Sequence, residues 1–256
     1  MDLDFGQHLK TWRGQRRLSQ LQLALEAGVS SRHIAFLETG RARPSRSMVL
    51  RLGEALDMPR ADRNLMLHAA GFRAAYGRRS FDDEALAPVR RAISHMIKGH
   101  QPYPAFVFDR HWTILGANES GQMMLSGFEL SEGDNFISFL LRPGKGAELV
   151  ENWGEVAAHL SSRFRLESAH LGGDTLLDHA AAALSQEAGP SLHAGSGDLP
   201  PVVPVQFRFA GGVYPMFSTI TQFGTAEDIA LADIKIEMFF PADDATETLF
   251  QQMAAG

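Results

Sequence analysis

The sequence contains no cysteine, which excludes disulfide bonds, thiolate metal sites and a cysteine nucleophile. It also lacks any run of about eighteen apolar residues, the length that a membrane-spanning helix needs. Its first residues, MDLDFGQHLKTWRGQRR, contain no apolar segment of the kind found in signal peptides. We therefore expect a cytoplasmic protein without a membrane partner.

Catalytic and metal-binding spacings are missing as well. The chain has 10 histidines, yet none falls in an HExxH pattern or in a spacing of two histidines and a carboxylate. No GxSxG motif presents a serine nucleophile, and RPGKG at residues 142–146 lacks the rest of a phosphate-binding loop. We therefore predict that the protein is not an enzyme and that it holds no metal ion or cofactor.

Charge divides the chain into two parts of opposite sign. Residues 1–79 carry 14 Lys and Arg against 7 Asp and Glu, a net charge of +7. Residues 80–256 carry 10 against 23, a net charge of −13. At 256 residues, 45% of them hydrophobic, the chain is long enough for two packed domains. We predict domains at 1–79 and 80–256, of which only the first meets a polyanion.

Two helix starts lie close together in the basic part, within LSQLQLALEAGVSSRHIAFLETGRARPS at residues 18–45. Ser19 and Gln22 form a capping box that begins one helix, and Ser30 caps the next. Gly28 ends the first helix because glycine adopts a left-handed C-cap without strain. A short helix, a glycine turn and a second helix with a polar outer tip indicate a helix-turn-helix.

The outer face of this motif suits DNA. We expect Gln20 to contact a phosphate and Arg32 and His33 to read bases. Glu38 is expected to hold a nearby arginine in a structural pair. A helical packing module without a DNA role would account for the caps, but not for the local positive charge. The full predicted DNA-binding set is Gln20, Ser30, Ser31, Arg32, His33, Phe36, Arg41 and Arg43.

This stretch resembles the helix-turn-helix of the xenobiotic-response-element (lambda-repressor-like) regulators. The matching residues are Ser19, Gln20, Leu23, Ala24, Ala27, Gly28, Val29, Ser30, Ile34, Glu38, Gly40 and Pro44. Leu21 and Leu25 stand where that family prefers charged residues, so we expect helix one or another domain to cover them. The resemblance implies an all-α, five-helix DNA-binding domain, completed by helices within 47–58 and 59–72. The inward residues expected in those two helices are Leu52, Leu56, Leu65 and Ala69.

The acidic part begins with a helix and two strands. A helix is expected at 85–100, and short apolar strands at 105–108 and 112–116. Asn118 then caps the next helix. Two strands joined by a tight turn, followed by a helix that Asn opens, resemble the start of a PAS domain, a sensory α+β fold.

The remainder of the acidic part changes from helices to strands. Helical periodicity covers 148–184, with a break at Gly172, and the Gly- and Pro-rich residues 189–204 form a loop. Apolar and polar residues alternate after that, in 205–209, 213–223 and 230–240. This order predicts an α+β domain with an antiparallel sheet and helices on one side of it.

The sequence of these segments is similar to that of the MmyB-like regulators. The similarity rests on PYPAFVF, DRHW and AN near residues 102–118, a helix that starts at Trp153, and FSTITQFGT and EMFFPAD near the end. It implies a one-component regulator with a PAS-like C-terminal domain at 80–256 for ligand binding and dimerisation. The ligand that the resemblance implies is an apolar small molecule, with a fatty acid or another acyl compound as the usual expectation.

Large aromatic and thioether side chains are more numerous in the acidic part than one sheet face needs, which favours an apolar pocket. Core packing is the alternative at each single position. His159 and Arg163, four residues apart on one helix, form a pair able to meet a carboxylate. The predicted ligand-binding set is Phe106, Phe108, Trp112, Leu115, Met123, Phe136, His159, Arg163, Phe217 and Met238.

Together these patterns predict a transcription regulator that acts as a homodimer on double-stranded DNA, because one short recognition helix reads few bases. Three alternatives remain open. In the first, the C-terminal domain is only a ligand-free dimerisation platform. In the second, it is a haem-binding PAS sensor that uses His95 or His111. An enzyme that carries a DNA-binding domain is the third, and the missing catalytic motifs disfavour it.

Overall fold

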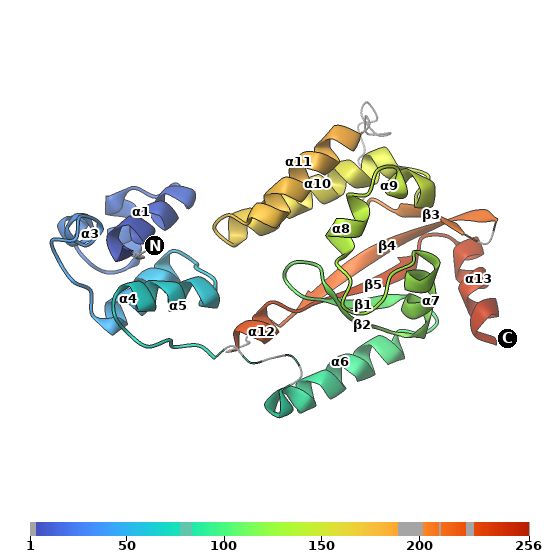
Figure 1. The fold of residues 1–256 in the computed structure, drawn as a ribbon, viewed down its shortest axis with the longest axis horizontal. Helices are drawn as coiled ribbons and strands as arrows, with labels where there is room; N and C mark the ends of the chain where they lie inside the picture. The colour runs from blue at the N-terminus through green and yellow to red at the C-terminus, as the bar shows by residue number, and fades with distance from the viewer. Residues whose placement is uncertain are drawn as a thin grey trace. The chain divides into compact units, whose positions relative to one another are not determined.

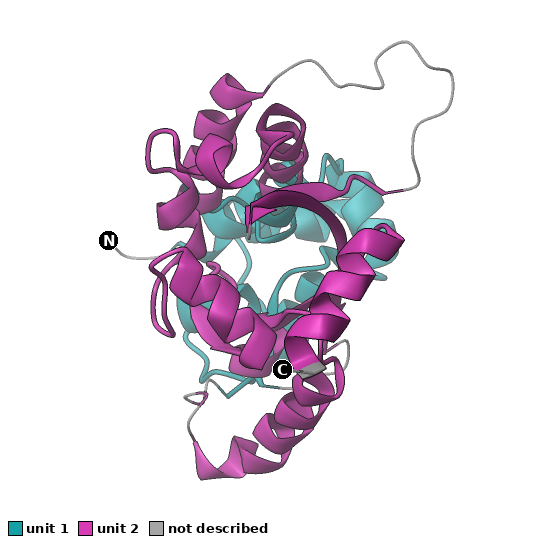
Figure 2. Cartoon of the chain, turned by 90° about the vertical axis from the view of Figure 1, so that its right-hand side faces the viewer, with its two compact units in different colours: residues 1–78, 166–175, 227–229 teal, residues 79–165, 176–226, 230–256 magenta. Residues whose placement is uncertain are grey.

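The computed structural model describes residues 4–77, 79, 81, 83–188, 202–209, 211–223 and 228–255. The chain divides into two compact units, which Figure 2 shows in different colours. Unit 1 comprises residues 1–78, 166–175 and 227–229, and unit 2 comprises the rest. The domain limits 1–79 and 80–256 stay a prediction. Most of the loop expected at 189–204 lies outside the described residues.

Five helices form the N-terminal part of unit 1, as expected (Figure 1). Side-chain oxygens of Asp4, Ser19, Ser30 and Ser45 each accept a hydrogen bond from a backbone N–H in the first turn of the helix that follows. These caps satisfy N–H groups that have no partner within the helix. The helices are α1 (Phe5–Gln15), α2 (Gln20–Glu26), α3 (Ser31–Glu38), α4 (Arg46–Ala55) and α5 (Arg60–Ala69).

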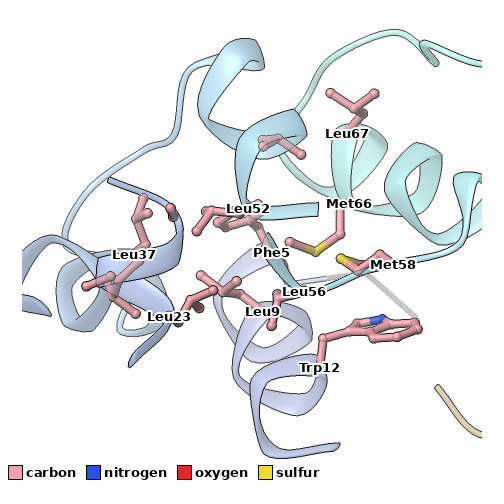
Figure 3. Packing of buried hydrophobic residues seen from close by; sticks show 14 residues of the cluster. Phe5, Leu9, Trp12, Leu23, Leu37, Leu52, Leu56, Met58, Met66 and Leu67 are labelled. Carbon is pink, nitrogen blue, oxygen red and sulfur yellow. The ribbon is translucent and has the colours of Figure 1, made fainter. Parts of the chain in front are cut away.

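A single hydrophobic core holds these helices together. Figure 3 shows Leu9 of α1, Leu23 of α2 and Leu52 of α4 among its buried side chains. The prediction that Leu65 faces inward is wrong, because 44% of this residue is exposed. Met66 and Leu67 are buried in its place. Successive helical residues point about 100° apart, so a one-residue error in the inferred stripe turns a side chain out of the core.

Helices α1 and α3 approach closely at Gly6. A Cβ atom at this position would lie 2.6 Å from the carbonyl oxygen of Glu38 and 2.7 Å from that of Leu37. Any larger residue would therefore push the end of α3 away from α1. The sequence alone does not predict this approach, because glycine is also tolerated in a first helical turn that has no close neighbour.

Unit 2 is built on one five-stranded antiparallel sheet, with the strand order β2-β1-β5-β4-β3. This confirms the predicted α+β class and the antiparallel pairing. The strand expected at 112–116 starts two residues too early, because the observed strand begins at Ile114. The strands are β1 (Ala105–Phe108), β2 (Ile114–Ala117), β3 (Val205–Phe209), β4 (Gly212–Gln222) and β5 (Lys235–Pro241).

Helices and one 3-10 turn surround this sheet or connect its strands (Figure 1). The break predicted near Gly172 is confirmed, since α10 ends at His170 and α11 starts at Thr175. Ser161 of α10 donates a hydrogen bond to the carbonyl oxygen of Ala181 in α11. These elements are η1 (Glu84–Leu86), α6 (Ala87–Gly99), α7 (Glu119–Gly127), α8 (Phe136–Leu140), α9 (Lys145–Leu149), α10 (Trp153–His170), α11 (Thr175–Glu187), α12 (Ile229–Ala232) and α13 (Asp244–Ala255).

Both faces of the sheet are covered, which corrects the expectation of helices on one side. Phe106 and Phe108 of β1 line one space together with residues of α8, α9 and α10 on one face of the sheet. The intervening residue Val107 packs with Ile93 and Ile97 of α6 on the opposite face (Figure 1). All four residues of β1 are buried. Such a short, wholly apolar strand is typical of a strand enclosed from two sides.

Asn118 joins three elements around β1. Its side-chain oxygen accepts hydrogen bonds from the backbone N–H of Ala105, at 3.0 Å, and of Gly121, at 2.9 Å. Its amide nitrogen donates to the carbonyl oxygens of Ile97 and Tyr103. The predicted helix cap is therefore confirmed. Because the side chain is buried, it also fixes α6 and α7 against the same strand.

Candidate functional site

The helix pair α2 and α3 has the local geometry that the sequence predicts. Ser19 Oγ accepts from the backbone N–H of Gln22 at 3.1 Å, and Gln22 Oε1 accepts from that of Ser19 at 2.7 Å. Gly28 has a φ of 63°, so the left-handed turn is confirmed. Ser30 Oγ accepts from the backbone N–H of His33 at 3.2 Å and begins α3. The cap leaves the first turn of α3 at the surface.

The predicted DNA-binding residues lie on the side of this motif that faces away from the core. Ile34 and Leu37 are fully buried, whereas Ser31 and Arg32 in the first turn of α3 are exposed. The Arg32 guanidinium lies over the Phe36 ring, 5.1 Å from its centre. The residues of the predicted set that are exposed are Ser30, Ser31, Arg32, Arg41 and Arg43, and those partly exposed are Gln20, His33 and Phe36.

A buried ion pair lies directly beneath the start of α2. Arg13 Nε is 2.6 Å from Glu38 Oε1, and Arg13 Nη2 is 3.0 Å from Glu38 Oε2. Gln20 Nε2 donates to the same Glu38 oxygen at 2.8 Å. The expectation that Glu38 pairs with an arginine is confirmed. Gln20, the proposed phosphate contact, therefore has a fixed orientation before any DNA arrives.

This environment lowers the pKa of Glu38. Burial alone would raise it, but hydrogen bonds from Arg13 and Gln20 outweigh burial, with the charges of Arg13 and Lys10 adding to them. The same contacts raise the pKa of Arg13, through the Glu38 hydrogen bond first. Both groups are thus charged at neutral pH, and the pair does not depend on small changes of pH.

Leu21 and Leu25 form an exposed apolar pair on α2. They are 59% and 72% exposed, so helix α1 does not cover them, and the expected alternative of cover by another domain stays a prediction. Residues four apart on a helix share a face, which places the two leucines side by side. Single exposed leucines are common on protein surfaces, and neither residue is part of the predicted DNA-binding set.

An apolar cavity of about 270 Å³ lies within unit 2. Its wall combines side chains of β1, β4 and β5 with side chains of α7, α8 and α10. Strands and helices from 106 to 239 thus converge on one space. The predicted ligand-binding residues that line it are Phe106, Phe108, Trp112, Phe136, His159, Arg163 and Phe217.

Three residues of that predicted set lie elsewhere. Leu115 and Met238 pack against the cluster of Ile93, Ile97 and Val107, on the face of the sheet opposite the cavity. Met123 is 50% exposed on α7, and its neighbour Met124 lines the cavity in its place. Composition identified segments that do contribute to the cavity wall or lie next to it, but not which residues of each segment face the cavity. On a strand, neighbouring residues point to opposite faces, so an error of one residue selects the wrong face.

The cavity wall also contains polar residues that the sequence did not reveal. Ser218 of β4 and Glu237 of β5 both line it, and Ser218 Oγ donates to Glu237 Oε1 at 2.6 Å. Glu237 is buried. Its position in the apolar strand IKIEMFF was a usable signal, because an ionised carboxylate inside an apolar strand needs a partner.

Trp112 forms the aromatic end of the cavity from a turn. Its φ of 65° is unusual for a bulky residue. The side-chain oxygen Oδ1 of Asp109 accepts from the backbone N–H of His111 and of Thr113, both at 2.8 Å, and so brackets the turn. The Trp112 carbonyl oxygen accepts from the backbone N–H of Phe136 at 2.9 Å. These bonds hold the indole against the ring of Phe108, 5.2 Å between ring centres.

Charged groups of opposite sign meet beside this indole. The Arg163 guanidinium lies 4.2 Å from the centre of the Trp112 ring, and Arg163 Nη1 lies 3.4 Å from Glu237 Oε1. The Lys235 ammonium is 4.7 Å from the same ring centre and donates to the Arg110 carbonyl oxygen. Cations over an indole face are stabilised by its negative charge density.

His159 lies one helical turn before Arg163 and faces the cavity, but its residue is exposed, so it stands at the rim. Desolvation lowers its pKa, and the positive charge of Arg163 lowers it further, whereas Glu237 acts in the opposite direction. The ring is therefore neutral at pH 7, with one nitrogen as a donor and the other as an acceptor.

Other candidate sites find no support in the described part of the chain. His95 and His111, the proposed haem ligands, do not line the cavity. No group of three or more metal-ligating side chains gathers among the described residues. The described helices also include none with the length and apolar character needed to cross a membrane.

Comparison with known families agrees with this two-part arrangement. Residues 4–66 match a family model described as a helix-turn-helix domain. Residues 89–253, more than half of the chain, match the model of the MmyB-like transcription regulator ligand binding domain. A search among curated proteins gave no match. The chain therefore belongs to the family of helix-turn-helix transcription regulators with an MmyB-like ligand-binding domain.

Proposed function

We propose that this protein is a one-component transcription regulator: α2 and α3 bind operator DNA, and the unit 2 cavity senses an apolar small molecule, a fatty acid or another acyl compound. The cavity is the observation that carries the proposal. A ligand-free platform needs no apolar cavity of this size, and packed protein cores seldom leave voids larger than a water molecule.

The DNA-binding half of the proposal rests on exposure and charge. Arg32 and His33 stand in the first turns of α3, where a recognition helix meets base edges. Arg41 and Arg43 follow α3 as exposed cations suited to phosphates. Gln20 starts α2 with its amide held by Glu38. We assign base reading to the first pair and phosphate binding to the other three.

Two copies of the chain are needed for this role. Helix α3 spans 8 residues and offers few side chains to the bases, so one copy reads a short sequence. We propose a homodimer on a pseudo-palindromic site, in which two recognition helices double the sequence that is read. A ligand changes operator binding only if its affinity differs between two arrangements of the dimer.

The alternatives make different predictions for the cavity. A dimerisation platform without a ligand would leave it empty in the purified protein. A haem sensor would need an axial histidine in the cavity wall; His95 and His111, the ligands expected from the sequence, do not line it, and His159, which does, stands at the rim. Both families matched by the chain are binding domains, and we propose that the protein has no enzymatic activity and acts in the cytoplasm.

Mass spectrometry of an organic extract of the full-length protein tests the proposal. We expect an apolar species in stoichiometric amount. Leu160→Trp places an indole in the cavity wall and should remove that species, whereas Arg32→Ala, a change on the DNA-binding surface, should retain it. Circular dichroism checks that both variants fold. A clean extract, together with no uptake of added acyl compounds, would support the ligand-free platform.

A further inference from the structure

Polar side chains of the cavity form a group around Glu237, which contacts two of them directly, while the charges of Arg163 and Glu237 act on His159. Arg163 and His159 come from neighbouring turns of α10, Ser218 from β4 and Glu237 from β5. Arg163 and Ser218 both contact Glu237 Oε1. The rest of the wall is dominated by aromatic and aliphatic side chains. Among the described lining residues, this group therefore offers the polar end of an apolar-chain ligand its hydrogen-bonding partners.

The charges of this group cancel. Arg163 carries one positive charge and Glu237 one negative charge, and their side chains are only 17% and 9% exposed. His159 adds none at pH 7. Lys235 lies over the Trp112 ring but does not line the cavity. The cation that the sequence offered to a carboxylate ligand is thus already neutralised by a carboxylate of the protein.

A second carboxylate would make this group negative. It would lie beside Glu237 in an apolar surrounding, where like charges repel strongly and ionised groups are poorly solvated. A hydroxyl, an ester carbonyl or an amide avoids this cost, because it brings hydrogen-bonding atoms without a charge. The neutral His159 ring at the rim offers a donor and an acceptor that match such a group.

We infer that the polar end of the ligand is uncharged, an alcohol, ester or amide on an acyl or alkyl chain, and that Glu237 determines this preference. The inference rests on the proposed ligand-sensing function and narrows it. It replaces the carboxylate suggested by the His159 and Arg163 spacing, since the sequence did not reveal that β5 brings Glu237 to Arg163.

Calorimetric titration of the full-length protein with matched probes tests the inference. The probes are alcohols, primary amides and carboxylic acids with octyl, dodecyl and hexadecyl chains, at about pH 7.5, chosen so that the acids are ionised. At the best chain length we expect the alcohol and amide to bind at least about tenfold more tightly than the acid. Tenfold corresponds to about one pKa unit, the lower end of what one charge within about 4–6 Å does to a carboxylate.

Two variants assign the preference to Glu237. Glu237→Gln keeps the size of the side chain and an acceptor for Ser218 but removes the negative charge that faces Arg163. The ratio of alcohol affinity to acid affinity should therefore fall at least about tenfold. Glu148→Gln is the matched control, because that side chain is 61% exposed on α9, and it should leave the ratio unchanged. If Glu237→Gln does not fold, Arg163→Gln should weaken acid binding further.

The outcomes separate this inference from the proposed function. An acid that binds the unaltered protein as tightly as the alcohol would overturn the inference and leave the ligand-sensing proposal in place. An unchanged ratio in folded Glu237→Gln would remove Glu237 from its assigned role. Failure of every probe, acids included, to bind would overturn both, since no apolar ligand would then enter the cavity.

Discussion

Arg13 and Glu38 form a two-point ion pair that joins α1 to the end of α3, with N–O distances of 2.6 and 3.0 Å. Their side chains are 15% and 3% exposed. The parallel contacts fix both the separation and the orientation of the two helices, as expected for guanidinium and carboxylate groups. Gln20 joins the same carboxylate, so three helices of the DNA-binding unit meet at Glu38.

Removing the cation of this pair should destabilise the DNA-binding unit. Arg13→Ala leaves the buried Glu38 carboxylate with the hydrogen bond from the Gln20 amide, and we expect a loss of about 3 to 5 kcal/mol. Hydrogen exchange of α1 and α3 amides measures the effect within this unit. Arg51→Ala, an exposed position on α4, is the control and should change stability by less than about 0.5 kcal/mol. Equal losses of stability in the two variants would show that the Arg13–Glu38 pair does not stabilise the DNA-binding unit.

Stability of the same unit should fall in acid. Because the folded pKa of Glu38 lies below its ordinary value of 4.5, the unfolded chain takes up this proton first as pH falls. The stabilisation is complete above pH 4.5 and is lost as pH falls toward the folded pKa. Glu38→Gln should flatten the dependence of unfolding free energy on pH in this window. The exposed Glu54→Gln should keep the slope of the unaltered chain.

Two glycines of α1 should respond oppositely to the same substitution. Gly6→Ala places a Cβ 2.6 Å from the Glu38 carbonyl oxygen, and we expect a cost of about 1 to 3 kcal/mol from the displaced backbone. Nothing lies within 4 Å of a Cβ at Gly14, so Gly14→Ala should stabilise by about 0.5 to 1 kcal/mol through helix propensity. Calorimetry measures the melting temperature of each variant. A shift of the same sign in Gly6→Ala and Gly14→Ala would contradict the close approach at Gly6.

The proposed division between base reading and phosphate binding predicts two kinds of loss. Arg32→Ala should weaken binding to an operator, selected from random DNA, by about 1 to 3 kcal/mol more than binding to unselected DNA. Gln20→Ala should weaken both alike and reduce the salt dependence of binding. Fluorescence anisotropy measures both. Equal losses for Arg32→Ala would make Arg32 a phosphate contact, and a sequence-selective loss for Gln20→Ala would reverse its role.

Local features were the ones that the sequence could predict. Ser19, Gln22 and Ser30 act within three residues of themselves, and Gly28 needs only its own backbone conformation, so short-range chemistry identifies them. Asn118 was recognised as a cap for the same reason. Its bonds to Ile97 and Ala105 were not, because they depend on how α6 and β1 come together in the fold.

The sequence did not predict which face of the sheet a residue occupies, or which residues of distant segments pair with each other. Leu115 and Met238 are as apolar as Phe106, and only the sheet register decides that they point away from the cavity. Arg163 of α10 was predicted to be available to a ligand carboxylate, and its protein partner Glu237 was missed because it lies 74 residues away on β5. Long-range pairing of this kind leaves no trace in periodicity, so a single sequence does not reveal it.

The turn at Trp112 bears on how much order a ligand must impose. The backbone of this turn is held by the Asp109 side chain and by the N–H of Phe136. These bonds form within the protein and do not depend on a ligand in the cavity. The indole is therefore in place before binding, and its unfavourable φ is compensated when the domain folds. Binding then costs little conformational entropy at this wall, so affinity should depend mainly on the fit of the ligand.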